Sequence, residues 1–487
     1  MELDDIAKNI KEVSLAAMFR FCIPGDDPPA DVLARAHCTT VGAAEGELGS
    51  STAGSSRKPT RSENDDHKPP LKRTLAIEIC KLFESLVEIA SAETSSRSQV
   101  DLHVDFQDTG GYADCKRLIN PPGGIFLNMD QDTLVDTDEE AALTASKDEA
   151  RRTKWLGHTP WANLVSPIEV EVEDYKCAFT FYGEPKHRRL LNRTGNRSLE
   201  RLLKHVGQLF IRHHRTHVYS LYVFCHQARI LYFDRAYTLV SESFEYGTSQ
   251  ETALHAFFWR IAHMSREQLG FDPTVVPAHP HDVKAMLEYG PEAPTNYIER
   301  QLYRALSRDP DEPGTGPVST RWPPYQLTMC GRRYIIGRPT FASPTLYGRC
   351  TRGYLAYDIE GKAVRFLKDS WRPDLERVQP EHKVYERLKA NGVTENVLTC
   401  LGYENVPDSD GSWQLTRTHE LISSTRPARG HYRILFEQVC RPLIDFTDFG
   451  ELTERICEAI YAHCCAWEGA GILHRDVSVN NIMIFEF

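Results

Sequence analysis

The chain has 487 residues, of which 41% are hydrophobic and 26% are charged. These values are ordinary for folded proteins, so they exclude wholesale disorder, a collagen-like repeat and a disulfide-dense scaffold. The 57 basic and 68 acidic residues give a formal net charge of −11, which disfavours a whole-chain polyanion binder but leaves room for a local basic patch.

The cysteine pattern and the N-terminus predict an intracellular protein. The 13 cysteines are an odd number without zinc-site spacing, which favours reduced thiols over disulfides. The opening MELDDIAKNIKE is acidic and polar, and no run of eighteen apolar residues occurs, so we expect neither a secretory signal nor a membrane span. Cytoplasm and nucleus are not distinguished by these features.

The first 150 residues predict short elements separated by polar stretches. Residues 5–21 carry apolar side chains at helical spacing, which predicts a lead helix. The Gly-, Ser- and charge-rich stretch from about residue 42 predicts a flexible linker, because it has too little apolar surface to offset the entropy of ordering. A second helix is expected from about Leu75 and a strand over 100–106, before an acidic, weakly structured stretch at 130–154.

From Trp155 to about Asp272 the pattern of strands, helices and a hairpin predicts an α+β domain. Glu169, Glu171 and Glu173 alternate along one predicted strand, so they share one face. They faintly resemble the acidic core of a PD-(D/E)xK nuclease, with Glu171 where that core has its lysine. A solvent-facing acidic edge strand is the simpler interpretation.

The segment 186–217 is strongly basic. Its cations are Lys186, Arg188, Arg189, Arg193, Arg197, Arg201, Lys204, Arg212 and Arg215, set against Glu200 as the single acidic residue. Such a run can meet a phosphate backbone, so nucleic-acid or other polyanion binding is one hypothesis. A solvated, charged helix face is the alternative.

A proline-rich stretch at 305–325 marks the next boundary, and a glycine-rich segment follows it. Gly348-Arg-Cys-Thr-Arg-Gly353 has G-x-C-x-x-G spacing, between the strand-like flanks 344–347 and 354–358. A glycine turn between antiparallel strands lets backbone N–H groups approach phosphate oxygens. Cys350 takes the middle position, where a side chain crowds that approach, and a plain hairpin is the alternative interpretation.

A lysine and a glutamate downstream are candidates for an ion pair. In Ala363-Val-Arg-Phe-Leu-Lys368, alternation places Lys368 on the apolar face of a strand. Glu381 follows Pro380 at the start of a predicted helix and lies on its core face. A buried ammonium requires an anionic partner, whereas a surface Lys and a first-turn Glu are the simpler interpretations.

After a predicted helix over 452–467 comes His474-Arg475-Asp476-Val-Ser-Val-Asn-Asn481. This matches H-R-D-x-x-x-x-N, the catalytic-loop pattern of protein kinases. In that chemistry an Asp accepts the proton of the attacking hydroxyl, and an Asn five residues on holds a magnesium ion.

In this order, the motifs resemble the fungal-type protein kinase family over about Trp155–Phe487. The segments that carry the resemblance are Gly348-Arg, Lys368-Asp-Ser-Trp371, Gly471-Ile-Leu-His-Arg-Asp-Val-Ser478, and Asp234-Arg235 with Ser241. The resemblance implies the cofactors ATP and Mg²⁺ and a protein substrate or partner chain, without a membrane.

The resemblance also implies a role for each site residue. Gly348, Cys350 and Gly353 would cover the ATP phosphates, Lys368 would contact the α and β phosphates, and Glu381 would hold Lys368. His474 and Arg475 would belong to the catalytic loop, in which Asp476 would be the catalytic base and Asn481 a metal ligand. Leu435–Val439 would lie near the adenine hinge. Phe487 comes six residues after Asn481, before the D-F-G motif that supplies the second magnesium ligand. We therefore expect a truncated kinase that transfers phosphate poorly alone, with its end from Ile482 an unpaired strand.

The predicted architecture is α+β, with an N-terminal α+β domain followed by a protein-kinase-like N-lobe and an incomplete C-lobe. The segments are a helical segment (1–41), a flexible linker (42–73), a helix and strands on the extension domain (74–129), an acidic segment (130–154), the extension domain (155–304), a Pro-rich linker (305–325) and the kinase-like domain (326–487). The expected function is ATP-dependent phosphoryl transfer to protein Ser/Thr. The alternatives are a non-catalytic nucleotide-binding pseudokinase or interaction module, and polyanion binding through 186–217 of a degraded nuclease-like domain.

Overall fold

The structure of the protein is a computed structural model. It describes residues 7–38, 71–93, 102–106, 123–127, 164–181, 190–192, 194–289, 295–306, 322–422 and 426–485. Most of the expected linker at 42–73, the acidic segment 130–154 and most of the Pro-rich linker lie outside the described residues.

The chain forms two compact units, and both helices and sheets are present, so the α+β prediction is confirmed. Unit 1 comprises Met1–Phe271 with Arg417–Ser423, and unit 2 comprises Asp272–Thr416 with Ser424–Phe487. The division at 271/272 differs from the expected boundary at 304/305. The reason is that residues after Asp272 pair and pack with the unit 2 sheet.

Unit 1 is built on a mixed sheet with strand order β1-β7-β6-β5-β4-β3-β2, and β8 pairs with β6. The β1/β7 and β4/β5 pairs are parallel and the other pairs antiparallel. The strands are β1 (Ile10–Val13), β2 (Leu102–Phe106), β3 (Gly123–Leu127), β4 (Leu164–Glu171), β5 (Val218–Phe224), β6 (Gln227–Phe233), β7 (Thr238–Ser241) and β8 (Phe244–Glu245).

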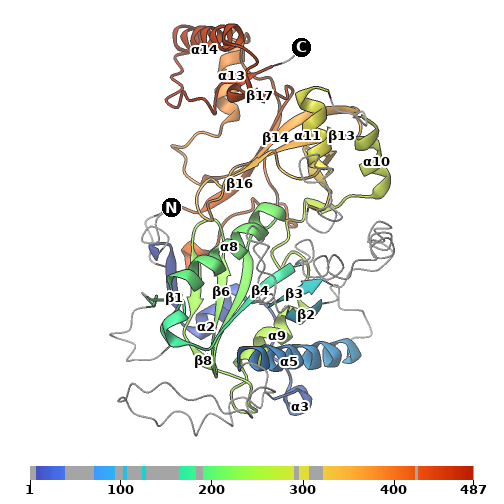
Figure 1. The fold of residues 1–487 in the computed structure, drawn as a ribbon, viewed down its shortest axis with the longest axis vertical. Helices are drawn as coiled ribbons and strands as arrows, with labels where there is room; N and C mark the ends of the chain where they lie inside the picture. The colour runs from blue at the N-terminus through green and yellow to red at the C-terminus, as the bar shows by residue number, and fades with distance from the viewer. Residues whose placement is uncertain are drawn as a thin grey trace, which may run out of the picture. The chain divides into compact units, whose positions relative to one another are not determined.

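Three longer helices cover this sheet (Figure 1). Helices α5 (Leu71–Glu93) and α9 (Ala253–His263) pack on one face, where the rings of Phe83 and Phe258 meet edge to face at 5.1 Å. Helix α8 (Asn196–Arg212) packs against β4 from the Glu169 face. Helix α8 connects β4 to its parallel neighbour β5, as a parallel pair requires a crossover.

The expected lead helix over 5–21 is partly wrong. Ile10–Val13 is strand β1, paired in parallel with Thr238–Ser241, because sheet pairing overrides the local helical spacing. After β1, helical turns follow in α2 (Leu15–Ala17), where the Ser14 side chain accepts a hydrogen bond from the Ala17 N–H, and continue as a π-helical turn. The short α3 (Ala30–Arg35) follows.

Unit 2 is built on an antiparallel sheet with strand order β15-β16-β14-β13-β11-β10-β9, and β12 pairs with β13. The strands are β9 (Val275–Pro277), β10 (Tyr325–Met329), β11 (Arg332–Ile336), β12 (Phe341–Ala342), β13 (Arg352–Asp358), β14 (Ala363–Pro373), β15 (Cys400–Asn405) and β16 (Arg429–Phe436). Pro344–Tyr347, expected as a strand, is not one, since β13 takes β11 as its hairpin partner across a longer connection.

The two faces of the unit 2 sheet differ in composition. Residues paired across strands share a face, so Lys368 lies with Gly353 and Ile434, and Asp369 lies on the opposite face. Helices α10 (Pro280–Tyr289), α11 (Tyr297–Ala305) and α13 (His382–Ala390) pack on the face that carries Lys368.

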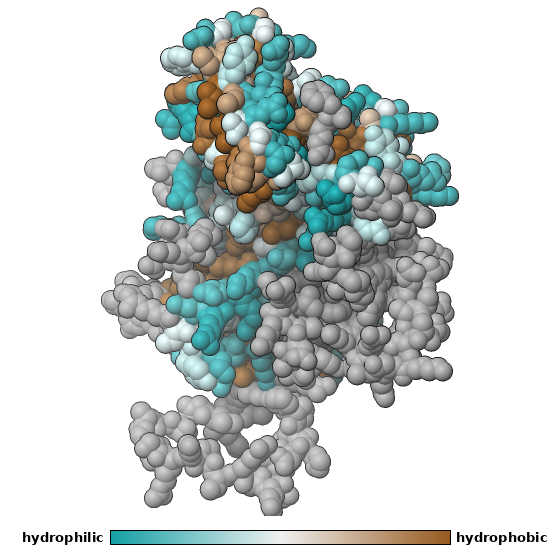
Figure 2. All heavy atoms as spheres, turned by 45° about the horizontal axis from the view of Figure 1, so that its top comes forward, coloured by the Kyte–Doolittle hydropathy of each residue, from teal (hydrophilic) through white to brown (hydrophobic). Residues whose placement is uncertain are grey.

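The last long helix, α14 (Phe449–Ala470), packs on α13 and ends at Gly471 in the left-handed conformation. The expected unpaired strand at the chain's end is wrong: β18 (Met483–Ile484) pairs with β17 (Arg441–Pro442). Helix α14 leaves an apolar side exposed, including Ile460 and Trp467. Figure 2 shows brown, apolar surface at the top of the view, where α14 lies.

Candidate active site

The structure joins Lys368 and Glu381 as an ion pair. The Lys368 Nζ donates to both carboxylate oxygens of Glu381, at 2.8 and 2.7 Å. Each side chain is 24% exposed, so the pair is shielded but not sealed from water. An ammonium held in this way keeps a fixed position from which it can also contact an anion.

Local structure explains how Glu381 reaches Lys368. Glu381 is the N-cap residue of α13, directly after Pro380. The next residue anchors the helix to the sheet, because the backbone N–H of His382 donates to the Tyr432 hydroxyl on β16 at 3.1 Å, and the His382 ring lies 3.0 Å from the same oxygen. The start of α13 is thereby fixed beside β14.

The loop after α14 groups Asp476 and Asn481. The side-chain amide nitrogen of Asn481 donates to the backbone oxygen of Asp476 at 2.9 Å and to its carboxylate at 3.0 Å. The backbone N–H of Asp476 donates to the His474 ring at 3.3 Å. Arg475 has φ +64°, a left-handed conformation unusual for a residue with a side chain, and such backbone strain is common at functional sites.

These loop residues are exposed, in contrast to the Lys368–Glu381 pair. Among the described residues, no hydrogen bond or ion pair joins Lys368 to Asp476. The structure therefore assembles two local groups, which are the ion pair on the sheet and the hydrogen-bonded loop that carries Asp476 and Asn481.

The G-x-C-x-x-G segment is not the expected simple hairpin loop. Gly353 lies inside β13, where an added Cβ would come within 2.3 Å of the Phe341 ring and 2.8 Å of the Phe366 ring. Gly348 has φ +107° and open space around it. The Cys350 thiol is buried and donates to the Leu346 carbonyl at 3.3 Å. A side chain at position 353 would thus displace one of these two aromatic rings.

A family model for fungal protein kinases matches residues 181–487. The chain belongs to the fungal protein kinase family. The match covers all of unit 2 and begins within unit 1, and it confirms the resemblance drawn from the motifs. A search of curated proteins finds no match to this chain.

A fungal protein kinase requires metal ligands, and the described residues offer few. An Asp-Phe-Gly string occurs at 448–450, but it precedes the loop that carries Asp476. The Asp448 side chain caps α14 by accepting from the Glu451 N–H at 3.0 Å. Among the described residues, no group of three His, Cys, Asp or Glu side chains is arranged to hold a metal ion. Every described cysteine is a free thiol.

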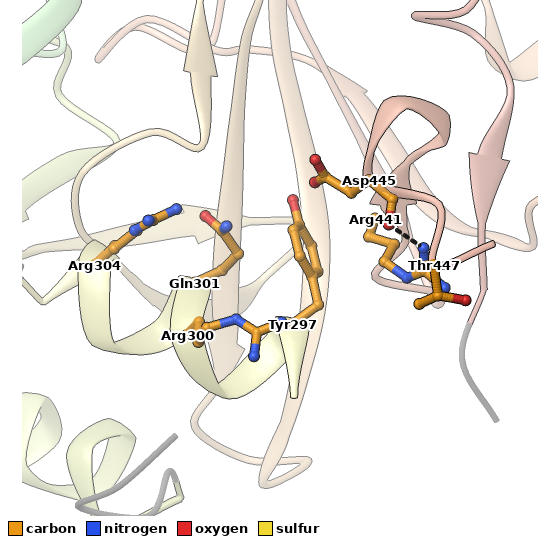
Figure 3. Close-up of a pocket in the computed structure, with 7 residues that line it drawn as sticks. All are labelled: Tyr297, Arg300, Gln301, Arg304, Arg441, Asp445 and Thr447. Atoms are coloured by element: carbon orange, nitrogen blue, oxygen red, sulfur yellow. Dashed lines mark hydrogen bonds between the residues drawn. The ribbon is translucent and has the colours of Figure 1, made fainter. Parts of the chain in front are cut away.

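The segment after the expected adenine hinge borders a cavity of about 290 Å³. Figure 3 shows Arg441, Asp445 and Thr447 on one side of it, and helix α11 on the other. The Arg441 side chain donates to the Asp445 carbonyl at 2.6 Å and pairs with Glu451. Neither Lys368 nor Asp476 lines this cavity.

The sequence motifs missed a buried charge cluster on the other face of the sheet. The Asp369 carboxylate accepts hydrogen bonds from Arg352 at 2.9 Å and Arg433 at 3.0 Å, and the His431 ring lies 2.9 Å away. Asp272 accepts from Arg433 at 2.5 Å. The Lys368-Asp369 dipeptide could have indicated this cluster, because strand alternation places one of these two charges on each face of the sheet.

The same cluster fixes the ionisation of its acids. Burial alone raises the pKa of Asp272, but Arg433 and His431 outweigh it and lower that pKa to about 2. For Asp369, burial is likewise outweighed by Arg352 and His431, and the pKa lies well below its usual range. Both carboxylates are therefore charged at neutral pH.

In unit 1, the interpretation of an acidic edge strand is wrong. Strand β4 lies between β3 and β5, and Glu169 and Glu171 are buried. Glu169 lies 2.6 Å from the His205 ring and 3.0 Å from the Arg201 guanidinium. Although burial raises the pKa of Glu169, these partners bring it below its usual range.

The basic segment of unit 1 is partly used for internal contacts. Arg215 is 2% exposed and donates to the carbonyls of Leu269 at 2.7 Å and Leu164 at 3.1 Å. Arg201 is committed to Glu169. Lys186, Arg188, Arg189 and Arg193 lie outside the described residues. None of the described helices is long and apolar enough to cross a membrane.

Proposed function

We propose that unit 2 binds Mg·ATP and transfers its γ-phosphoryl group to a Ser or Thr hydroxyl of a protein substrate. The observation that carries this proposal is the Lys368–Glu381 ion pair, set on the antiparallel sheet of unit 2 in a chain of the fungal protein kinase family. Such a pair must be in place for a kinase to hold the nucleotide phosphates.

The residues present suit the nucleotide's charge. Bound Mg·ATP would supply the phosphoryl group, with the metal neutralising charge on it. The Lys368 ammonium would contact the α and β phosphates while Glu381 keeps it in position. Both hydrogen bonds of the Asn481 side chain to Asp476 use its amide nitrogen, so its amide oxygen is the atom offered to a metal.

Asp476 would act as the base. Its carboxylate would accept the proton of the substrate hydroxyl as that oxygen forms a bond to the γ-phosphorus, while the bond from that phosphorus to the bridging oxygen of ADP breaks. One hydrogen bond from Asn481 would hold the Asp476 carboxylate, and the other, with the turn at Arg475, would hold the Asp476 backbone.

A non-catalytic nucleotide-binding module is the second candidate. It is favoured by one observation: the Gly348–Gly353 segment does not form a phosphate-covering hairpin, because Gly353 lies in β13 and Cys350 is buried against Leu346. In that function Lys368, held by Glu381, would still bind nucleotide, while Asp476 would play no chemical role.

The experiment is a titration with Mg·ATP that follows thermal stability and phosphate transfer to a Ser/Thr peptide mixture together. Lys368→Ala is expected to abolish both the stabilisation and the transfer. Asp476→Ala is expected to keep the stabilisation and lower transfer about 10²–10⁴-fold. Lys383→Ala is the matched control, because Lys383 is an exposed lysine of α13 paired with Glu386.

The outcomes separate the two candidates. Stabilisation without any transfer by the unmodified chain would establish the non-catalytic module. Stabilisation that survives Lys368→Ala would show that the nucleotide binds elsewhere and would sink both candidates.

A further inference from the structure

Helix α11 packs on the sheet face that carries Lys368. Its Leu302 and Ala305 join one apolar cluster with Leu355 of β13 and Val364 of β14. Leu355 pairs with Phe366, and Phe366 shares its face with Lys368 two residues further on. The α11 side chains therefore cover the same surface from which the Lys368 ammonium projects.

The same cluster reaches the expected adenine hinge. Val439, at the end of the hinge segment, is buried in it together with Leu302 and Met286 of α10. A nucleotide whose phosphates meet Lys368 and whose base meets the hinge must lie along the strip of sheet between them. Leu355 and Phe366 form that strip, and α11 packs against it.

The backbone at the end of α11 is hydrogen-bonded to the segment that follows β11. The Ala305 carbonyl accepts a hydrogen bond from the Arg338 N–H at 2.8 Å. A Cβ added to Gly337, at the end of β11, would lie 1.9 Å from that oxygen, so the contact leaves no room between α11 and the connection that leads to Gly348.

Helix α11 is nevertheless held on the sheet by few buried side chains. It has nine residues, of which only Leu302 and Ala305 are buried. Its other side is polar: Tyr297, Arg300, Gln301 and Arg304 line the 290 Å³ cavity and face the segment after the hinge (Figure 3). A capping box between Asn296 and Glu299 stabilises its start. A short helix with solvent space behind it can leave the sheet without unfolding the sheet.

We propose that α11 is an autoinhibitory cover, whose docking on the Lys368 face competes with binding of nucleotide. This inference rests on the proposed function, because it concerns the regulation of the same site. If the binding-competent state is the one with α11 released, the apparent Kd for Mg·ATP exceeds the intrinsic Kd by the reciprocal of the released fraction. Changes that weaken α11 docking then tighten nucleotide binding.

The test measures Mg·ATP affinity by calorimetry on the full chain and two release variants. Leu302→Asp places a charge in the apolar contact and is expected to tighten binding more than tenfold. Asn296→Ala with Glu299→Ala removes the capping box without touching the sheet, and is expected to tighten binding about three- to tenfold. This second variant keeps the test valid if Leu302→Asp fails to fold.

A control variant and a second measurement show whether a change in affinity comes from α11. Lys284→Ala alters an exposed residue of the neighbouring α10 and is expected to leave the affinity within twofold. Hydrogen exchange of the peptide 297–305 is expected to rise when Mg·ATP saturates the unmodified chain. Adding Lys368→Ala to a release variant is expected to abolish binding.

Two results would overturn the proposal in distinguishable ways. Equal affinity of the unmodified chain and both folded release variants would show that α11 does not cover the site, and would leave the proposed function standing. No binding by any folded variant would reject nucleotide binding itself, and the cover with it.

Discussion

Lys368 and Asp369 are neighbours on β14, yet they stand in opposite settings. Lys368 is 24% exposed and pairs with Glu381, at the start of a helix. Asp369 is fully buried and is shared by Arg352, Arg433 and His431 from the adjoining strands. The alternation of a strand sends one charge to each face of the sheet.

Under the proposed function, Lys368 is a charge that serves binding, whereas Asp369 is a charge that serves the structure of unit 2. A partly exposed pair contributes little to folding, because water already solvates both groups. A buried cluster has lost that solvation, so each member depends on the others for compensation. On this basis, changes at Asp369 should reduce stability, and changes at Lys368 should reduce function.

The largest effect is expected from Asp369→Asn. The substitution keeps the shape but leaves Arg352 and Arg433 without the buried anion they share, so we expect the free energy of unfolding of unit 2 to fall by about 3–5 kcal/mol. Denaturant unfolding of the variant measures the loss. A change below 1 kcal/mol would mean that the buried Asp369 face of β14 does not contribute more to stability than the Lys368 face.

The second-largest effect is expected from acid, which should lower the stability of the buried charge cluster around Asp272 and Asp369. The folded-state pKa of Asp272 is about 2, against an ordinary value of 3.8. Because the folded-state pKa is depressed, its contribution is complete above about pH 4 and is lost as the pH falls towards 2, a loss of about 2 kcal/mol from this group. Asp369, also depressed, adds to it.

Hydrogen exchange of peptides from β14 and β16, measured between pH 5 and pH 2 with correction for the intrinsic rate, would report this loss. Asp272→Asn is the matched variant, and its exchange should depend less steeply on pH. Identical pH dependence of exchange in both proteins would show that its partners do not lower the pKa of Asp272.

The sequence was sufficient for the parts of the site that depend on local spacing. The H-R-D-x-x-x-x-N spacing predicts that Asp476 and Asn481 lie in one loop. Strand alternation, followed by a helix that begins after Pro380, predicts that Lys368 lies beside Glu381. The α+β class follows similarly, because α5, α8 and α14 have long apolar periodicity.

What the sequence did not reveal depends on distant partners. Ile10–Val13 has helical spacing but becomes a strand because β7, more than 200 residues away, offers an edge. Helix α11 precedes the glycine segment by over 40 residues, and nothing in its own pattern indicates which sheet face it covers. Asp369 looks like an ordinary surface acid until Arg433 and Asp272 are placed beside it.

The smallest effect, and the sharpest contrast, should come from a double-mutant cycle of Lys368→Ala and Glu381→Gln. Because both side chains are partly exposed, we expect their coupling in unfolding free energy to be below about 1 kcal/mol. The same single variants should nevertheless abolish or strongly weaken nucleotide binding. A coupling as large as the Asp369 effect would instead make this pair a structural element, and the difference between the faces of β14 would then lie only in burial.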